Sequence, residues 1–534
     1  MNPLEPSTVR PDLSSEMRSP ESKPISFHMV RSVIFSLVRK MVLGPVSLLL
    51  VPFTLHRIGV TGYGTWAILL TVVSMSFLMD PGLSPAITKF VAEHNGRSEF
   101  PQIRQVLNTS FAVCLVMSTI AVCTLWFGSH LIIGQLFRGP DAPPTSEVLS
   151  LWPLILVTVA ACLMSIPFRA VINGLQRMDI TNLLIFSAEV ISVSFTVIFL
   201  LAGAKVRGLL IAELLASLFM LSGSVLVVRR LVPGMVPNPF HCELVTLRKI
   251  GSFSMILYSG YVMTTLQSHL EKLYLARFVG VVPVGWYSMA SQAASKVQRV
   301  PDLLLAPVLA AASELEAAKE QRKINELHFR AHKYLAFASV PLVIFAIFTA
   351  KTLVTLWVGS HLEIIAFPLA LLVLGRFFPQ MGAPTYFMLV GRGILRPAVY
   401  TAAVASILNV VLSILFIRRW GFPGAVWGTA LPMLISTVYF FVKCKPYFEI
   451  SLYQTLRRAY LKPLLCALAA SLVIPVISTF SLRIWEDLLV KLFAFGVLYL
   501  SGLAVTRFFD NFDFTKAETH LPLLRLARRI APVA

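Results

Sequence analysis

Six basic side chains interrupt long apolar stretches of this sequence. They are Arg39, Lys40, Lys296, Arg299, Arg376 and Lys491. A charged side chain inside a bilayer costs about 3 kcal/mol and generally faces a cavity or a partner. Lys296 and Arg299 are three residues apart, so they share one face of a helix.

We predict that five of these cations line a cavity that binds an anion: Arg39, Lys40, Lys296, Arg299 and Arg376. Phosphate and pyrophosphate are the anions that a guanidinium binds best, because both of its N–H edges can be used at once. We expect Lys491, near the start of its stretch, to extend to the membrane surface.

Three acids interrupt the same apolar stretches, namely Glu189, Glu213 and Glu271. They are candidate coupling acids, which would bind Na+ or H+, or charge partners of the cations. Glu189 and Glu213 could instead neutralise cations in helix packing. Glu271 could form an outer-surface pair with the neighbouring Lys272.

The composition excludes a soluble or a disordered protein. Of 534 residues, 56% are hydrophobic and only 13% are charged, and the mean hydropathy is +0.76. Ordinary globular chains are about 45–50% apolar and about 25% charged. No P-loop, HExxH, GxSxG or Cys/His metal spacing occurs in the sequence, so we expect neither an enzyme, nor a metal, nor a bound cofactor.

The apolar stretches predict a polytopic, all-α membrane protein, because helices alone need spans of about 20 residues. We identify fourteen candidate spans: 30–55, 63–79, 107–133, 148–171, 179–202, 207–228, 250–270, 284–311, 334–356, 364–388, 397–417, 423–442, 460–480 and 486–506.

The distribution of Lys and Arg predicts the orientation of these spans. If the N-terminus is inside, 30 of the 46 basic residues fall in inner segments and ten in outer segments. Basic residues favour the cytoplasmic side. We therefore expect both termini to be cytoplasmic and the protein to lie in the bacterial inner membrane.

The sequence also repeats itself. Gly59 and Gly64 are five residues apart at the start of a long span, and so are Gly280 and Gly285, at an offset of 221 residues. A second match, of Gly174–Arg177 with Gly391–Arg396, has an offset of about 217. Two matches at nearly one offset predict two six-helix parallel repeats that form two lobes, followed by two C-terminal helices. In transporters with such repeats the substrate site lies between the repeats.

These considerations predict the following division of the chain: a disordered cytoplasmic tail at 1–28, an N-lobe of helices 1–6 at 29–232, a cytoplasmic linker at 233–249, a C-lobe of helices 7–12 at 250–445, helices 13–14 at 446–508, and a basic cytoplasmic tail at 509–534.

The motifs resemble a known family. The segment Ile58–Trp66, followed by Asp80–Glu93, resembles the first two helices of the polysaccharide biosynthesis and O-antigen flippases, which belong to the multidrug/oligosaccharidyl-lipid/polysaccharide exporter superfamily. The segment Phe278–Ala290, and the stretch from Gly391 through Asn409 to Ala425, resemble the second half of these proteins. The resemblance covers about residues 28–445.

The resemblance implies an inner-membrane transporter that moves undecaprenyl-pyrophosphate-linked oligosaccharides by alternating access, in O-antigen or exopolysaccharide assembly. It implies as partners the bilayer, a lipid-linked glycan and the glycan polymerase or export machinery, and no nucleic acid. Arg39 and Arg299 match the family's cavity cations by helix and depth. Glu271 stands where the family often has Asp. The alternatives are a multidrug cation exporter of the same superfamily, which needs buried acids, and a membrane glycan polymerase or ligase, which needs an outer catalytic loop.

Overall fold

The computed structural model describes residues 25–510 and Asp513, except positions 77, 79–81, 233–237, 239–242, 244–245, 249–250, 252–257, 259–261, 263–264, 266–268, 303, 449–450, 481 and 511–512. The side chains of residues 25–41, 300, 306, 310 and 452 are likewise outside the description. Within the described part the chain is helical, with no strand.

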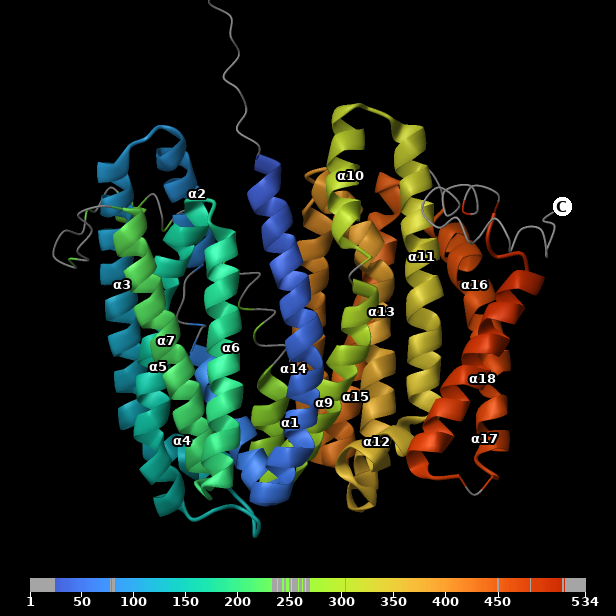
Figure 1. Cartoon of the computed structure of the whole chain (residues 1–534), viewed down its shortest axis with the longest axis horizontal. Coiled ribbons are helices and arrows are strands. Elements are labelled where there is room, and N and C mark those ends of the chain that lie inside the picture. Colours follow the sequence, from blue (N-terminus) through green and yellow to red (C-terminus); the bar gives the residue numbers. More distant parts are fainter. Residues whose placement is uncertain are drawn as a thin grey trace, which may run out of the picture.

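The first half of the chain forms one group of long, roughly parallel helices (Figure 1). Its helices are α1 (Ile25–Ser76), α2 (Leu83–Gly96), α3 (Phe100–Phe127), the short α4 (Ser129–Leu136), α5 (Thr145–Gly174), α6 (Met178–Leu201) and α7 (Lys205–Leu231). The long helix α1 contains a break at Gly59, whose φ of 69° and ψ of 177° are not helical.

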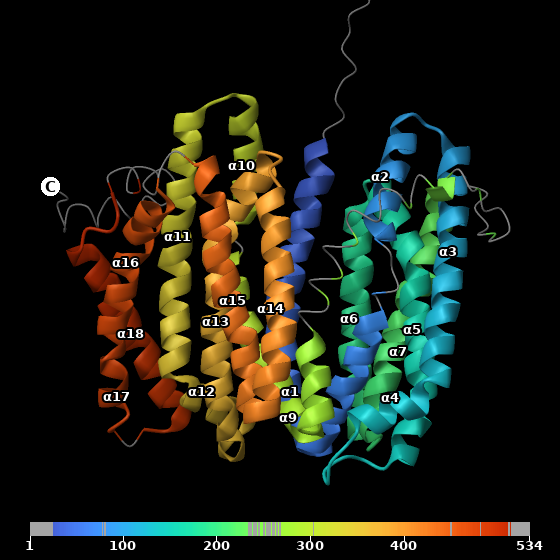
Figure 2. The same cartoon turned by 180° about the vertical axis from the view of Figure 1, so that it is seen from behind.

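The second half forms a second group beside the first (Figure 2). Its elements are α9 (Val281–Asp302), α10 (Ala306–Ala317), α11 (Gln321–Phe348), α12 (Ala350–Val358), η2 (Ser360–Ile365), α13 (Ala366–Gly391), α14 (Arg396–Trp420), α15 (Phe422–Cys444) and η3 (Lys445–Tyr447). The chain ends in α16 (Leu452–Ser471), α17 (Val473–Ile477) and α18 (Ile484–Val505), which pack outside α11. In both views α1 and α9 lie between the two groups.

Eleven helical segments of the described part are long and apolar enough to cross a membrane. The predicted spans 30–55 and 63–79 fall in one element, α1, and the predicted span 284–311 is divided into α9 and α10. Most of the predicted span 250–270 lies outside the described residues. The protein is therefore a multi-pass α-helical membrane protein, and the count of fourteen spans stays a prediction.

The predicted span 107–133 differs from the helices found there. Helix α3 begins earlier, at Phe100, because Pro101 suits the first turn of a helix, and it ends at Phe127, before the separate helix α4. Helix α1 begins at Ile25, within the segment predicted as a tail at 1–28.

The element starts reproduce the offset of the sequence repeat. Helices α3, α4 and α5 begin at residues 100, 129 and 145, and α11, α12 and α13 begin 221 residues later, at 321, 350 and 366. For α7 and α15, which begin at 205 and 422, the offset is 217. The repeat therefore extends to the short helices α4 and α12. Superposition of the halves about an axis along the membrane normal stays a prediction.

Described residues that follow α18, at the start of the predicted basic tail 509–534, pack against α11. Arg330 donates to Asp513 at 3.2 Å, Tyr334 does so at 2.6 Å, and Lys333 forms an ion pair with the same carboxylate. Burial raises the pKa of Asp513, but hydrogen bonds from Lys333 and Tyr334 outweigh it, so the net pKa lies below its usual value. The charged carboxylate thus fastens the end of the described chain to the second group of helices.

Candidate functional site

The contact between the two groups of helices is formed by the repeated glycines. A Cβ atom on Gly64 of α1 would lie 3.0 Å from the Val281 carbonyl carbon of α9 and would clash with its oxygen. A Cβ on Gly285 of α9 would lie 3.1 Å from the Val60 carbonyl oxygen of α1. The backbones of α1 and α9 can approach this closely only because neither position carries a side chain.

Polar contacts continue along the same pair of helices. Tyr63 Oη of α1 donates to Gln292 Oε1 of α9 at 3.5 Å. One turn further along α9, Lys296 Nζ donates to Ser47 Oγ of α1 at 2.5 Å. Because Gln292 and Lys296 are four residues apart, one face of α9 points at α1.

The predicted cations Lys296 and Arg299 continue this face. Lys296 is half-buried and lies within electrostatic range of Arg299 and of Glu189 on α6. Arg299 is exposed. The structure therefore brings Lys296, Arg299 and Glu189 together between the two groups of helices. Arg39 and Lys40 are part of α1, but their side chains lie outside the described residues.

A second face of α9, about a quarter-turn round the helix, contacts α13. Arg376 Nη2 of α13 donates to Ser291 Oγ at 2.9 Å, and its Nε is buried without a hydrogen-bond partner among the described residues. One turn on, Gln380 Nε2 donates to the Gln298 carbonyl at 2.8 Å and to Asp302 at 2.9 Å. Arg376 thus contacts a face of α9 next to the one that carries Lys296.

Glu271 is a buried acid of the second group of helices. It is 1% exposed, so the outer-surface pair with Lys272 that we considered is wrong. Asn409 Nδ2 of α14 donates to its Oε1 at 2.6 Å, and Thr429 Oγ1 of α15 lies 3.4 Å away. Arg376 and Lys272 are both within electrostatic range of the carboxylate.

Further polar atoms belong to this hydrogen-bond network. Tyr287 Oη lies 2.8 Å from Thr429 Oγ1. Asn409 Oδ1 is buried and has no hydrogen-bond partner among the described residues. Asn409, Thr429 and Tyr287 were not predicted as site residues, because an uncharged side chain in an apolar stretch gives no charge signal.

The remaining acid and base are placed elsewhere. Glu213 of α7 accepts a hydrogen bond from Ser192 of α6 at 3.3 Å, within the first group of helices. Lys491 is 3% exposed and donates to Asp487 at 2.6 Å, so it pairs along α18 and does not extend to the surface as expected.

Comparisons with known proteins agree with this fold. The structure resembles that of the lipid II flippase MurJ in an inward closed conformation, with a TM-score of 0.71, 13% sequence identity, and coverage of 89% of this chain and 98% of MurJ. It also resembles a multidrug resistance MATE family transporter of the MOP superfamily in an inward-facing conformation, with a TM-score of 0.55, 16% identity, and coverage of 72% and 93%. At these identities the likeness shows the fold.

No curated protein sequence matches the chain significantly. The family described as "Polysaccharide biosynthesis protein" matches residues 29–313, which is more than half of the chain. These residues include α1, the glycine contact and the cationic face of α9. The protein belongs to this polysaccharide biosynthesis family, as the motifs around Gly59 and Gly280 predicted.

Proposed function

We propose that this protein is a flippase that moves an anionic lipid-linked oligosaccharide across the bacterial inner membrane. The observation that carries the proposal is the placement of Lys296 and Arg299 on the face of α9 between the two lobes. From here on, the N-lobe is α1–α7 and the C-lobe is residues 269–279 with α9–α15. The family and the fold support a transporter, and the cations support a substrate with a phosphate or pyrophosphate group.

The mechanism follows from the two kinds of contact along α1 and α9. At the glycines the backbones touch, which closes one side of the membrane. Toward the other end of α9, the positively charged side chains of Lys296 and Arg299 bind the pyrophosphate group of the substrate, while the lipid tail of the substrate stays in the bilayer. Separation of the lobes at the glycines, with closure at the opposite end, would then expose the same cations to the other side. A multidrug cation exporter would need an excess of acids here, whereas the two cations Lys296 and Arg299 outnumber the one acid near them, Glu189, and so favour an anion.

Removal of these cations tests the substrate class. In a strain that needs this protein for glycan assembly, Lys296→Ala and Arg299→Ala should each weaken substrate affinity by about ten- to a hundredfold, because one charge-assisted hydrogen bond contributes about 1.5–3 kcal/mol. Arg39→Ala, the change predicted from sequence, should have the same effect. Arg299→Lys should recover part of the activity, since the charge stays and the planar fork is lost.

A matched control is Lys351→Ala, which removes a cation from an exposed pair with Glu363. It should leave glycan assembly unchanged. Protein abundance in the membrane is measured for each variant. Full activity of Lys296→Ala and Arg299→Ala at normal abundance would contradict the proposal.

We also propose that Glu271 binds the coupling ion, either a proton or Na+. The support is a buried carboxylate that is contacted by Asn409 Nδ2 at 2.6 Å and Thr429 Oγ1 at 3.4 Å, together with the Oδ1 atom of the same Asn409, which has no partner in the described structure. Carboxylate, amide and hydroxyl oxygens are ligands that hard cations prefer. Arg376 is within electrostatic range, so ion binding at Glu271 would change the field at α9, which Arg376 contacts through Ser291.

The proposed orientation can be tested by thiol labelling in intact cells. In a cysteine-free background, Asp141→Cys in the α4–α5 loop should react with an impermeant thiol reagent, because we place that loop outside. Ala318→Cys in the α10–α11 turn should react only after the membrane is opened. Both positions are exposed in the structure. The opposite pattern would show that the termini lie outside.

A further inference from the structure

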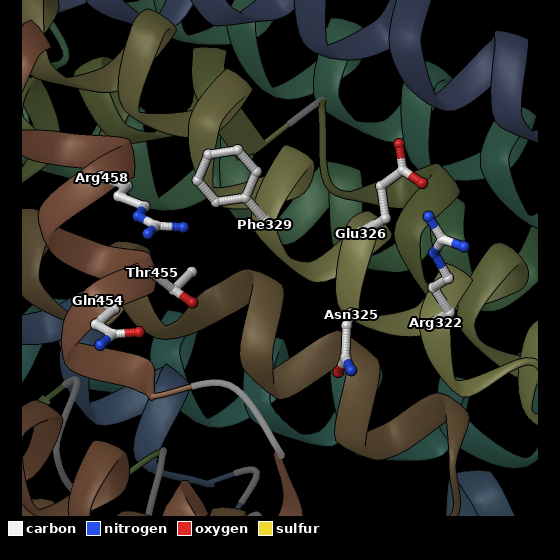
Figure 3. A pocket seen from close by; sticks show the side chains of 7 residues that line it. All are labelled: Arg322, Asn325, Glu326, Phe329, Gln454, Thr455 and Arg458. Carbon is white, nitrogen blue, oxygen red and sulfur yellow. The ribbon is translucent and has the colours of Figure 1, made fainter.

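A second polar site lies between the C-lobe and the terminal helices. A cavity of about 450 Å³ opens between α11 and α16, near the start of both helices. Its lining is shown in Figure 3 and consists of Arg322, Asn325, Glu326, Phe329, Gln454, Thr455 and Arg458. Its volume is within the range of sites that hold small ligands. It does not include any residue of the site between the lobes.

The lining is suited to a phosphate group. Arg322 comes from α11 and Arg458 from α16, and neither forms an ion pair with a described residue. The carboxylate of Glu326 is engaged by Arg330 at 2.9 Å. Figure 3 shows the guanidinium groups of Arg458 and Arg322 on opposite sides of the cavity, and the side-chain amides of Asn325 and Gln454 add further hydrogen-bond donors to its lining. Arginine pairs from separate elements bind phosphate oxygens by this combination of charge and direction.

An exposed apolar stripe leads away from the same cavity. Along α16 and the residue that follows it, Arg458 is succeeded by Leu461, Leu465, Leu468 and Leu472, at alternating spacings of three and four residues. These spacings place all five residues on one helix face. The four leucines are 41%, 57%, 39% and 70% exposed, and they lie in a helix that is apolar enough to span the membrane.

The cavity and the leucine stripe together complement an amphiphile, which is a molecule with a charged group at one end and a hydrocarbon chain that lies along the bilayer. A soluble anion would need the arginines alone, whereas the leucine stripe gives a hydrocarbon chain a surface next to them. Basic pockets between transmembrane helices at the cytoplasmic side bind anionic lipid headgroups. Under the proposed orientation, this end of α11 and α16 is the cytoplasmic one.

We infer that the cavity binds the phosphate headgroup of one anionic phospholipid, with an acyl chain along the leucine stripe of α16. Such a lipid contacts both α11 and α16, so it fastens the terminal helices to the C-lobe. The Asp513 contact with Lys333 fastens the same two parts from within the chain. The inference concerns a resident lipid and does not depend on the transported substrate.

The test uses the full-length protein in nanodiscs of phosphatidylcholine, with or without phosphatidylglycerol. Retention of phosphatidylglycerol is measured by native mass spectrometry, and the melting temperature is measured in both lipid compositions. Arg322→Gln and Arg458→Gln should each lower phosphatidylglycerol affinity by about ten- to a hundredfold. They should also abolish the rise in melting temperature that this lipid gives to the wild type. Arg322→Lys and Arg458→Lys, which keep the charge, should lose part of the affinity.

Two neighbouring cations are matched controls. Lys323 and Arg457 adjoin the two arginines on the same helices but do not line the cavity. Lys323→Gln and Arg457→Gln should therefore retain the lipid. An equal loss in these controls would show general surface attraction and overturn the inference.

A further experiment distinguishes a bound lipid from a bound soluble anion. Leu465→Gln should weaken phosphatidylglycerol retention while both arginines stay in place. Inorganic phosphate, added to protein in phosphatidylcholine nanodiscs, should raise the melting temperature less than phosphatidylglycerol does. Equal stabilisation by inorganic phosphate, with full lipid retention in Leu465→Gln, would overturn the assignment to a lipid.

Discussion

Replacing Gly64 with alanine is expected to hold the two lobes apart where they touch and to abolish transport. The added Cβ would clash with the backbone carbonyl of Val281, which cannot rotate away as a flexible side chain could. Overpacking of a close contact costs about 1–3 kcal/mol. That is enough to depopulate the state in which this side of the membrane is closed. Cross-linking of cysteines placed at Tyr63 and Gln292, whose side chains contact each other across the same pair of helices, should fall, together with glycan assembly.

Two other glycine substitutions serve as controls for the Gly64→Ala variant. Gly44→Ala lies on the same helix in open space and should leave both readouts unchanged. Gly285→Ala should have an intermediate effect, because its Cβ would lie 3.1 Å from the Val60 carbonyl oxygen, a distance that a shift of a few tenths of an ångström relieves. Wild-type cross-linking in Gly64→Ala would show that the contact is looser than described.

The second large effect is expected for Glu271→Gln. Glutamine has nearly the same shape, and its Oε1 can still accept the hydrogen bond from Asn409, so the C-lobe should fold normally. It carries no charge and binds no proton, so ion coupling should be lost. We expect transport in proteoliposomes to fall by about tenfold or more, and its dependence on a proton or Na+ gradient to disappear.

The surface acid Glu363 is a suitable control for this experiment. It pairs with the exposed Lys351 at 2.5 Å, and Glu363→Gln should keep the gradient dependence of the wild type. A Glu271→Gln protein that still responds to either gradient would show that the coupling ion binds elsewhere. In that case the cationic face of α9 would keep its proposed role, because the two proposals rest on different residues.

Most of the fold could be predicted from the sequence, because the length of each apolar stretch reflects the thickness of the bilayer and the basic residues between the stretches reflect their orientation. The repeated glycines predicted the start of a long span near Gly59 and again near Gly280, and both residues have positive φ angles, of 69° and 129°. The short helices α4 and α12 were merged into the spans before them. A hydropathy average over about twenty residues does not register a turn at one residue such as Gly128 or Thr349.

The candidate site was predictable only in part. Charges in apolar stretches identified Lys296, Arg376 and Glu271, because burial of a charge is costly wherever the residue lies. The neutral partners of Glu271 could not be identified in this way. Asn409 and Thr429 carry no charge, and their roles depend on how α14 and α15 pack against residues 269–279.

The glycine contact has the form of a dimer interface within one chain. Position 60 meets position 285, and position 64 meets position 281, and the two pairs are related by the same offset of 221 residues. In a two-fold dimer every residue is mutated twice by one codon change, and the interface stays self-complementary. Here each codon alters one half of the contact alone. The two halves can therefore diverge independently, and the tighter fit at Gly64 than at Gly285 shows that they have already done so.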